Sequence, residues 1–397
     1  MFPSQPENPA PSLRAERILV VQYSQTGQQL AALDALLGPL LEAGVPVHRE
    51  TLRTSPAYPY PWPFWKFLDT FPETVTGDAP ALEPLTIPPG AEFGLVIIAY
   101  PVWFLSPPPA LTAFLLGDDA RRLLRGRPVI TLTACRNMWI MAQEKIKTLL
   151  AGIGARHCDH ITLTDRGNAF ASFITTPRWL LTGRKNRFWG LPPAGVSERD
   201  IHGCARFGRA ILSALRAPVA GTASGVSASA SSGGASADTP AGALGIPTDA
   251  SADTPDSTSA DTAIATPAAF STGTFASAST PSTPAAPDAA PAGTPLLAGL
   301  RACMVDVKLI ASERVGARNF HLWAKILRAC GRPGSPPRNA MLLVFTAFFL
   351  ALILTVVPAS VVLKTLFAPL LRKKLARAAA LYEQPSGSGG ERLALFS

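Results

Sequence analysis

Short apolar runs rich in β-branched residues alternate with helical patterns between Arg17 and about Arg216. Runs of this kind are typical of parallel strands that are buried on both faces of a sheet. We expect strands at 18–23, 46–52, 93–103, 127–135 and 155–165, and helices at 27–44, 109–124 and 141–154. Because strands that alternate with helices form βαβ units, the pattern predicts an α/β fold with a doubly wound, parallel, five-stranded sheet.

The composition separates this region from the rest of the chain. Residues 1–16 are polar and proline-rich, lack the apolar stretch of a signal peptide, and predict a disordered lead-in. Residues 217–298 are almost entirely Ala, Ser, Thr, Pro and Gly, and SADTP occurs in them at 236–240 and 251–255. Such a segment buries too little apolar area to fold, so we expect a disordered linker after a folded domain at 17–216.

The C-terminal part predicts contact with a membrane. Residues 299–339 have the pattern of a basic amphipathic helical segment, and 372–397 form a basic, polar tail. Between them, 340–371 is strongly apolar, and its uncharged core at 341–363 is long enough to cross a bilayer. Three arrangements remain open: one transmembrane helix, a hairpin bent at Pro358 in the membrane interface, and a buried core helix. Basic residues flank both sides, so charge does not orient the segment.

The net charge of +9 and the cysteine pattern narrow the function classes. The basic residues form no long run, which argues against a nucleic-acid-binding tail. Many of them lie near the apolar C-terminal segment, where an anionic membrane surface is the expected partner. The five cysteines are an odd number without a CxxC pair, so we expect neither a disulfide scaffold nor a metal site. Free thiols fit a reducing cytoplasm.

A short polar loop separates the first expected strand from the helix that follows it. A helix N-terminus exposes unpaired N–H groups and the positive end of the helix dipole, which suits a phosphate. The loop has neither the lysine of a Walker A motif nor a GxGxxG pattern, and an ordinary N-cap turn is the alternative. The candidate phosphate-binding residues are Ser24, Gln25, Thr26, Gly27, Gln28 and Gln29.

Two further loops follow expected strands. In PVWFLSPPP, Trp103 and Phe104 are suited to stacking on a flat ring, although a hydrophobic plug has the same composition. In CRNMW, Arg136 can meet an anion and Asn137 the edge of a heterocycle. Cys135 as a nucleophile has little support, because no pattern pairs it with a histidine. All three loops end strands of one parallel sheet, so we expect them to share a crevice at its carboxyl edge.

Together, SQTG and PVWFLSPPPALTAFL resemble the flavodoxin-like, FMN-dependent oxidoreductases over roughly Arg17 to Thr164. The resemblance implies that the first loop holds the FMN phosphate. It also implies that the isoalloxazine ring is lined by Pro101, Val102, Trp103, Phe104, Cys135, Arg136 and Asn137. The third loop is bulkier here than the glycine-containing loop of that family, so the resemblance leaves the substrate above the ring undefined.

Residues 164–193, with ACRNMW and the apolar C-terminal segment, resemble a narrower group of bacterial proteins, the dialkylresorcinol condensing enzymes. This resemblance implies a role in making aromatic lipids. A flavin is a suitable hydride acceptor for aromatising a cyclic enone, whereas condensation needs a nucleophilic thiol. Basic and aromatic residues alternate in 178–189, which would rest on lipid headgroups or cap the crevice.

We therefore expect a membrane-associated FMN-dependent oxidoreductase at the cytoplasmic face of the inner membrane. Its substrate would be hydrophobic, such as a quinone or cyclic enone, with NAD(P)H as a candidate hydride donor. The expected partners are membrane lipid and this small molecule, without nucleic acid, and a homodimer is left open. The alternatives are an acyl-condensing enzyme, an electron carrier of the flavodoxin type, and a membrane-tethered scaffold.

Overall fold

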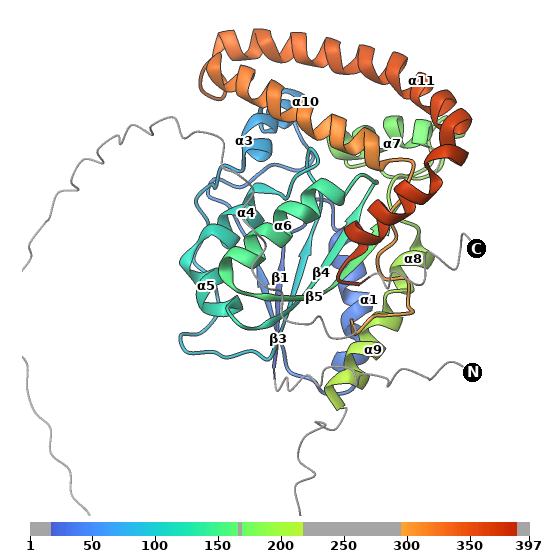
Figure 1. The fold of residues 1–397 in the computed structure, drawn as a ribbon. Helices are drawn as coiled ribbons and strands as arrows, with labels where there is room; N and C mark the ends of the chain where they lie inside the picture. The colour runs from blue at the N-terminus through green and yellow to red at the C-terminus, as the bar shows by residue number, and fades with distance from the viewer. Residues whose placement is uncertain (1–16, 166–168, 217–294, 387–397) are drawn as a thin grey trace, which may run out of the picture. The chain divides into compact units, whose positions relative to one another are not determined.

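Five parallel strands form one sheet in the order β2-β1-β3-β4-β5 (Figure 1). The strands are β1 (Ile18–Gln22), β2 (Val47–Thr51), β3 (Leu95–Tyr100), β4 (Pro128–Cys135) and β5 (Arg156–Thr164). Every residue of β1, β3 and β4 is buried, because helices cover both faces of the sheet. The predicted five-stranded parallel sheet is confirmed, and its strand order is that of the flavodoxin-like fold.

The computed structural model describes residues 17–165, 169–216 and 295–386, without the side chains of 169–170, 353 and 356–373. The predicted lead-in, the linker up to residue 294 and the tail from 387 lie outside this part of the chain. All described residues belong to one compact unit.

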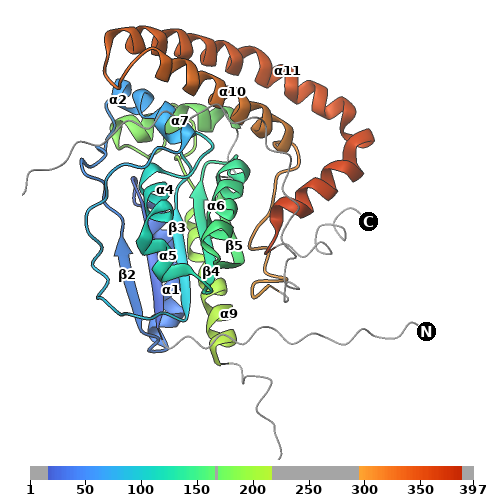
Figure 2. The ribbon, with the colours of Figure 1, turned by 60° about the vertical axis from the view of Figure 1, so that its left-hand side comes forward.

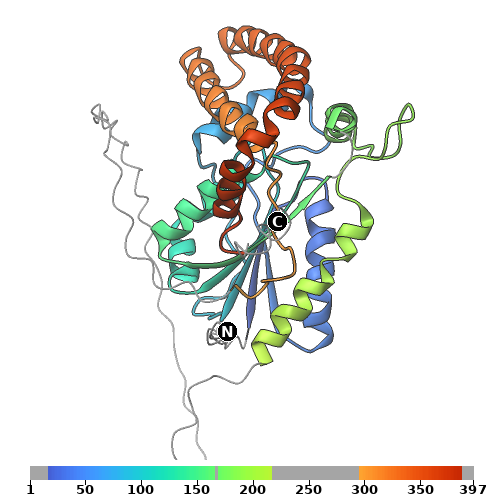
Figure 3. The same ribbon diagram turned by 45° about the vertical axis from the view of Figure 1, so that its right-hand side comes forward.

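Two helical layers bury the faces of the sheet. On one side α1 (Gln28–Glu42) and α9 (Ala205–Arg216) lie side by side, as Figure 3 shows in blue and yellow-green. They approach closely because Gly208 has no side chain: a Cβ there would lie 2.0 Å from the Leu36 carbonyl oxygen. The other side carries α4 (Pro109–Leu116), α5 (Asp118–Leu124) and α6 (Ile140–Ile153).

The chain between β2 and β3 and the predicted helix at 109–124 both differ from expectation. Two short helices that the sequence pattern did not indicate, α2 (Phe64–Asp69) and α3 (Phe71–Thr76), follow β2. The single helix predicted over 109–124 is wrong, because Gly117 is extended (φ −77°, ψ 165°) and divides it into α4 and α5. The short α8 (Glu198–His202) precedes α9.

Three helices lie at the carboxyl end of the sheet. They are α7 (Ala169–Thr182), α10 (Ile310–Ala329) and α11 (Pro336–Glu383), and Figures 1 and 2 both show α10 beside α11 at that end. Phe71 of α3 joins α10 and α11 to the domain, since its ring stacks on Phe345 of α11 at 4.6 Å and meets Phe320 of α10 at 5.1 Å.

The apolar segment predicted to meet a membrane at 340–371 is part of α11. The helix continues through Pro358, so the expected hairpin is wrong. Within the described residues, no helix is both long enough and apolar enough to cross a bilayer.

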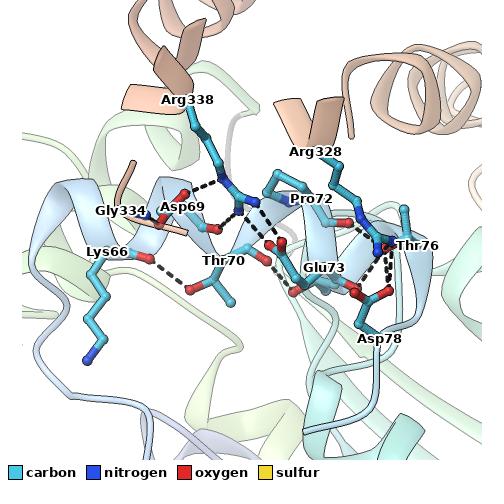
Figure 4. A network of polar contacts seen from close by, with 11 residues as sticks. Lys66, Asp69, Thr70, Pro72, Glu73, Thr76, Asp78, Arg328, Gly334 and Arg338 are labelled. Atoms are coloured by element: carbon cyan, nitrogen blue, oxygen red, sulfur yellow. Dashed lines mark hydrogen bonds and ion pairs between the residues drawn. The ribbon is translucent and has the colours of Figure 1, made fainter. Parts of the chain in front are cut away.

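Residues 295–386 contact the α/β domain at several points. Arg338 of α11 binds Asp69 and Glu73, and Arg328 of α10 binds Asp78 (Figure 4). Further along, the Thr162 N–H of β5 donates to the Ala302 carbonyl at 2.8 Å. Leu297, which falls inside the predicted linker, is fully buried in the core beneath α1 and α9.

Candidate functional site

The β1–α1 loop forms an open cradle at the start of α1. Gly27 has φ 81° and ψ −18°, a left-handed conformation that glycine adopts without strain. Its N–H donates to the Ser24 hydroxyl at 3.1 Å, and a Cβ built on Gly27 would meet no atom within 4 Å. No side chain caps the helix. The loop therefore has the open space and the helix N-terminus that a phosphate group requires.

The three glutamine side chains of this loop are held by other parts of the protein. Gln29 is buried and binds β4. Its Nε2 donates to the Leu132 carbonyl at 3.1 Å, and its Oε1 accepts from the Ala134 N–H at 2.7 Å. Gln25 binds the chain after β2, and Gln28 accepts from the loop before α8. Their backbone partners are Pro59, Leu132, Ala134 and Val196. What the loop offers a phosphate is thus its backbone and the hydroxyls of Ser24 and Thr26.

The first and second predicted loops meet through aromatic side chains. Trp103 lies edge-on to Tyr23 at the end of β1, with 5.7 Å between ring centroids, and to Tyr58 and Trp62 at 5.4 Å each. Only 9% of Trp103 is exposed. Trp103 therefore supports the crevice from within an aromatic cluster instead of presenting an open face for stacking. Pro101 and Val102, which precede it, are half-buried.

A tight turn separates Phe104 from Trp103. The backbones of Trp103 and Ser106 exchange hydrogen bonds of 2.9 and 2.8 Å. The two central residues, Phe104 (φ 48°) and Leu105 (φ 59°), are both left-handed, which is uncommon for residues other than glycine. The turn directs Phe104 to Phe67 and Phe71, at centroid distances of 4.9 and 5.3 Å. The two aromatic residues predicted to line one ring thus contact different neighbours within one connected set of rings, since Trp62 and Phe67 also meet at 5.7 Å.

The third predicted loop is fixed by α7. Arg136 Nε donates to the Ser172 hydroxyl at 2.6 Å, and the guanidinium carbon lies 3.7 Å from the centre of the Phe173 ring. Burial lowers the pKa of Arg136 to about 10, and Asp165 acts in the opposite direction. The Leu180 carbonyl of the same helix accepts a hydrogen bond of 3.0 Å from the Trp62 N–H. The helix α7 therefore contacts the loops after both β2 and β4.

Cys135 lies in the core. Its side chain is buried, and burial, followed by the nearby Glu313, raises the pKa of the thiol. His157 and His160 of β5 instead share the Thr131 hydroxyl, at 2.9 and 2.8 Å. Burial lowers the pKa of His157 to about 3. Among the described residues, no three His, Cys, Asp or Glu side chains are grouped to hold a metal ion.

Glu313 of α10 is a site residue that sequence reasoning missed. It lines a cavity of about 270 Å³ together with Asn137, Trp139 and Asp165. Its Oε1 accepts from the Met141 N–H at the start of α6 at 2.7 Å, while its Oε2 is buried without a partner in the described structure. Burial raises the pKa of Glu313 to about 7, although the backbone N–H groups of Met141 and Ile140, which donate to this carboxylate, lower the pKa. The sequence feature that could have indicated Glu313 is that it is the single acidic residue of an otherwise basic helix.

Two cavities are larger than the one lined by Glu313. One of about 1560 Å³ is lined by Asp165, Gly195, Arg206 and Arg301, among others, and borders the Val196 N–H that binds Gln28. The other, of about 480 Å³, lies between the Phe104 turn, α6 and α10. Residues 24–29 line none of these three cavities.

No protein-family model and no curated protein matches the sequence. The chain is similar to a flavoprotein in complex with FMN from Lactobacillus acidophilus, with 16% identity over 37% of this chain and 91% of that one (TM-score 0.30). It is also similar to a flavodoxin from the domain Archaea, with 13% identity over 51% and 99% (TM-score 0.29). The oxidised flavodoxin 1 of Bacillus cereus gives 12% identity over 49% and 95% (TM-score 0.27).

Proposed function

We propose that this chain binds FMN at the carboxyl edge of its sheet and transfers hydride to or from a hydrophobic substrate. The observation that carries the proposal is the open, glycine-containing cradle at the start of α1. It follows β1, next to β3, where the strand order reverses. Ligands of open α/β sheets bind outside the strand ends at this switch point, and a helix N-terminus favours a phosphate.

The residues of the cradle fit the phosphate of FMN. Backbone N–H groups of the loop and the hydroxyls of Ser24 and Thr26 would hold it, and Val102, Arg136 and Asn137 would lie toward the ring. Bound FMN supplies a ring that accepts and returns hydride. The protein's own contribution is to orient the ring and exclude water, for which the contacts of α7 with the loops after β2 and β4 are suited.

The finer proposal is aromatisation of a cyclic enone in the synthesis of dialkylresorcinol lipids, with NAD(P)H as a candidate hydride donor in other reactions. The acyl-condensing alternative needs a reactive thiolate. The buried Cys135, with its raised pKa, favours the redox chemistry over it, and His157 and His160 bind the Thr131 hydroxyl. An electron carrier without a substrate stays the second candidate, and turnover distinguishes the two.

We also propose that α10 and α11 rest on the anionic cytoplasmic face of a membrane without crossing it. One stretch of α11 exposes large apolar side chains, and α10 exposes basic ones. The apolar set is Leu343, Val344, Phe348, Leu350 and Leu354, and the basic set is Arg314, Arg318, Lys325 and Arg328. Exposed apolar area beside basic residues suits the interface of an anionic bilayer.

Vesicle flotation tests this attachment. The full chain should float with vesicles that contain phosphatidylserine, and less with phosphatidylcholine alone. The double variant Leu350→Asp with Leu354→Asp should lose most of the binding, while Leu41→Asp, at an exposed leucine of α1, should retain it. Equal flotation of the two variants would contradict attachment through α11.

The flavin proposal is tested by the visible absorption spectrum of the purified full chain, before and after FMN is added. Flavin bands that co-purify, or that shift saturably on titration, are the expected result. Candidate hydride donors and acceptors are then screened by bleaching and return of these bands. A colourless protein that leaves the FMN spectrum unchanged would overturn the proposal.

A further inference from the structure

The cavity between the Phe104 turn, α6 and α10 has apolar walls, and the charged side chains that line it are basic. Its volume of about 480 Å³ is within the range of small-molecule pockets, about 300–1,000 Å³. Phe104 and Phe320 supply aromatic walls. The charged or titratable groups come from two helices, Lys145 from α6 and Arg314, Arg318 and His321 from α10. No acidic side chain is among the described residues that line it.

Lys145 brings an ammonium group into this cavity. Its Nζ donates to the Val75 carbonyl at 2.9 Å and to the Ser106 hydroxyl at 2.8 Å. Both acceptors are neutral, and a lysine has three N–H donors, so one donor and the positive charge remain for a ligand. Burial lowers the pKa of this lysine, which a bound anion would reverse.

Two arginines of α10 add to this charge, and His321 lies on the same helix face. Burial, followed by Lys325 and Lys145, lowers the pKa of His321, so this side chain adds a neutral imidazole. Arg314, Arg318 and His321 follow each other at four and three residues, the spacing of neighbours on a helix surface. In the part of the chain that the structure describes, neither arginine forms an ion pair with a carboxylate. An exposed basic helix face is commonly just solvated, but here it meets the ammonium group of Lys145, which is held by Val75 and Ser106, across one apolar cavity.

We propose that this cavity binds an amphiphilic carboxylate, with its aryl or alkyl part against Phe104 and Phe320 and its carboxylate between Lys145, Arg314 and Arg318. Phe104 ends the loop that is proposed to line the flavin ring, so the cavity adjoins that loop. We infer that such a carboxylate is the substrate class of the oxidoreductase, an assignment that rests on the proposed function. A phosphate head group on the same tail has the related chemistry and is distinguished by experiment.

The test is calorimetric titration of the full chain, without FMN, with decanoate, decyl phosphate, decanol and inorganic phosphate. Decanoate should bind saturably, more tightly than decyl phosphate and than neutral decanol. The double variant Arg314→Gln with Arg318→Gln should lose about tenfold or more in decanoate affinity, the usual effect of removing charge-assisted hydrogen bonds. Lys325→Gln neutralises an exposed lysine of the same helix that does not line the cavity, and should change the affinity less than about twofold.

Each outcome bears on the proposal. Absence of decanoate binding, equal binding of decanol, or equal affinity of the double variant and the parent chain would overturn the cavity assignment. Tighter binding of decyl phosphate than of decanoate would show that the head group of the ligand is a phosphate and not a carboxylate. FMN titration of the same variants keeps the two proposals apart, since neither arginine belongs to the FMN loops. Decanoate binding without FMN binding would leave the cavity standing and remove only its role as the substrate site.

Discussion

Arg338 of α11 and Glu73 of α3 are 265 residues apart in the sequence and form a bidentate ion pair. The two guanidinium nitrogens donate to the two carboxylate oxygens at 2.7 and 2.6 Å. Arg338 also donates hydrogen bonds to the carboxylate and to the backbone carbonyl of Asp69. Only 1% of the arginine side chain is exposed. This one side chain therefore fastens the start of α11 to the α/β domain (Figure 4).

Replacing Arg338 by Met should be strongly destabilising. It leaves Asp69 and Glu73 partly buried without their cation, and breaking such a buried pair costs about 3–5 kcal/mol. Arg338→Lys should recover only part of the loss, because an ammonium group cannot bind two carboxylates through a planar fork. Urea unfolding monitored by tryptophan fluorescence measures the change.

Arg328→Met is the matched control on the neighbouring helix. Arg328 binds Asp78 at 2.9 Å, but both side chains are about 40% exposed or more. A pair in this environment contributes about 0–1 kcal/mol. If both arginine variants lost the same free energy of unfolding, burial would not be what makes Arg338 important.

Glu313→Gln should raise stability at neutral pH and above. Burial raises the pKa of this carboxyl from 4.5 to about 7 in the folded chain. Between these values the unfolded chain has released the proton and the folded chain still holds it, so the free energy of unfolding falls as pH rises. Glutamine keeps the oxygen that accepts from Met141 and removes the ionisation.

The gain should therefore be larger near pH 8 than near pH 4, because the ionisation cost is absent below pH 4.5, grows as the pH rises to about 7, and is complete above it. Melting temperatures across this pH range, beside the exposed control Glu83→Gln, measure the difference. A gain independent of pH would show that the unpaired Oε2, and not its ionisation, is the destabilising feature.

Alkylation by iodoacetamide should distinguish the five cysteines by burial. Cys330 and Cys158 are partly exposed and should be modified first, with Cys158 slower because burial raises its pKa. Cys135, Cys204 and Cys303 are buried and should react only on unfolding. Peptide mass spectrometry gives the order, and rapid labelling of Cys135 would revive the acyl-condensing alternative.

Thr26→Asp should weaken FMN binding without weakening the fold. A carboxylate beside the start of α1 interacts favourably with the helix dipole, by about 0.3–1 kcal/mol, but repels a phosphate in the same place. We expect an FMN affinity reduced about tenfold or more and an unchanged or higher melting temperature. Thr26→Asn introduces a side chain of the same shape as aspartate without its charge, and should reduce the FMN affinity less. Fluorescence quenching of FMN measures the affinity of both variants.

Sequence reasoning was most reliable where the signal is local. The β-branched run at 18–22 predicts a buried strand, and the positions of Leu33, Leu36, Leu37 and Leu40 predict a helix that covers it. It was wrong at 109–124, because Gly117 is tolerated in a helix as well as at a break, and the extended backbone there is set by how α4 and α5 pack.

By itself, the sequence determined the strand–loop–helix units and the carboxyl-edge position of their loops, because side-chain period and glycine conformation act over a few residues. Only the tertiary structure decided that Gln29 binds β4, that Trp103 and Phe104 contact different rings, and that Glu313 and Arg338 return to the domain from beyond residue 294. These contacts join residues far apart in the chain. Their partners depend on which buried polar groups meet when the helices pack, and no local pattern encodes that.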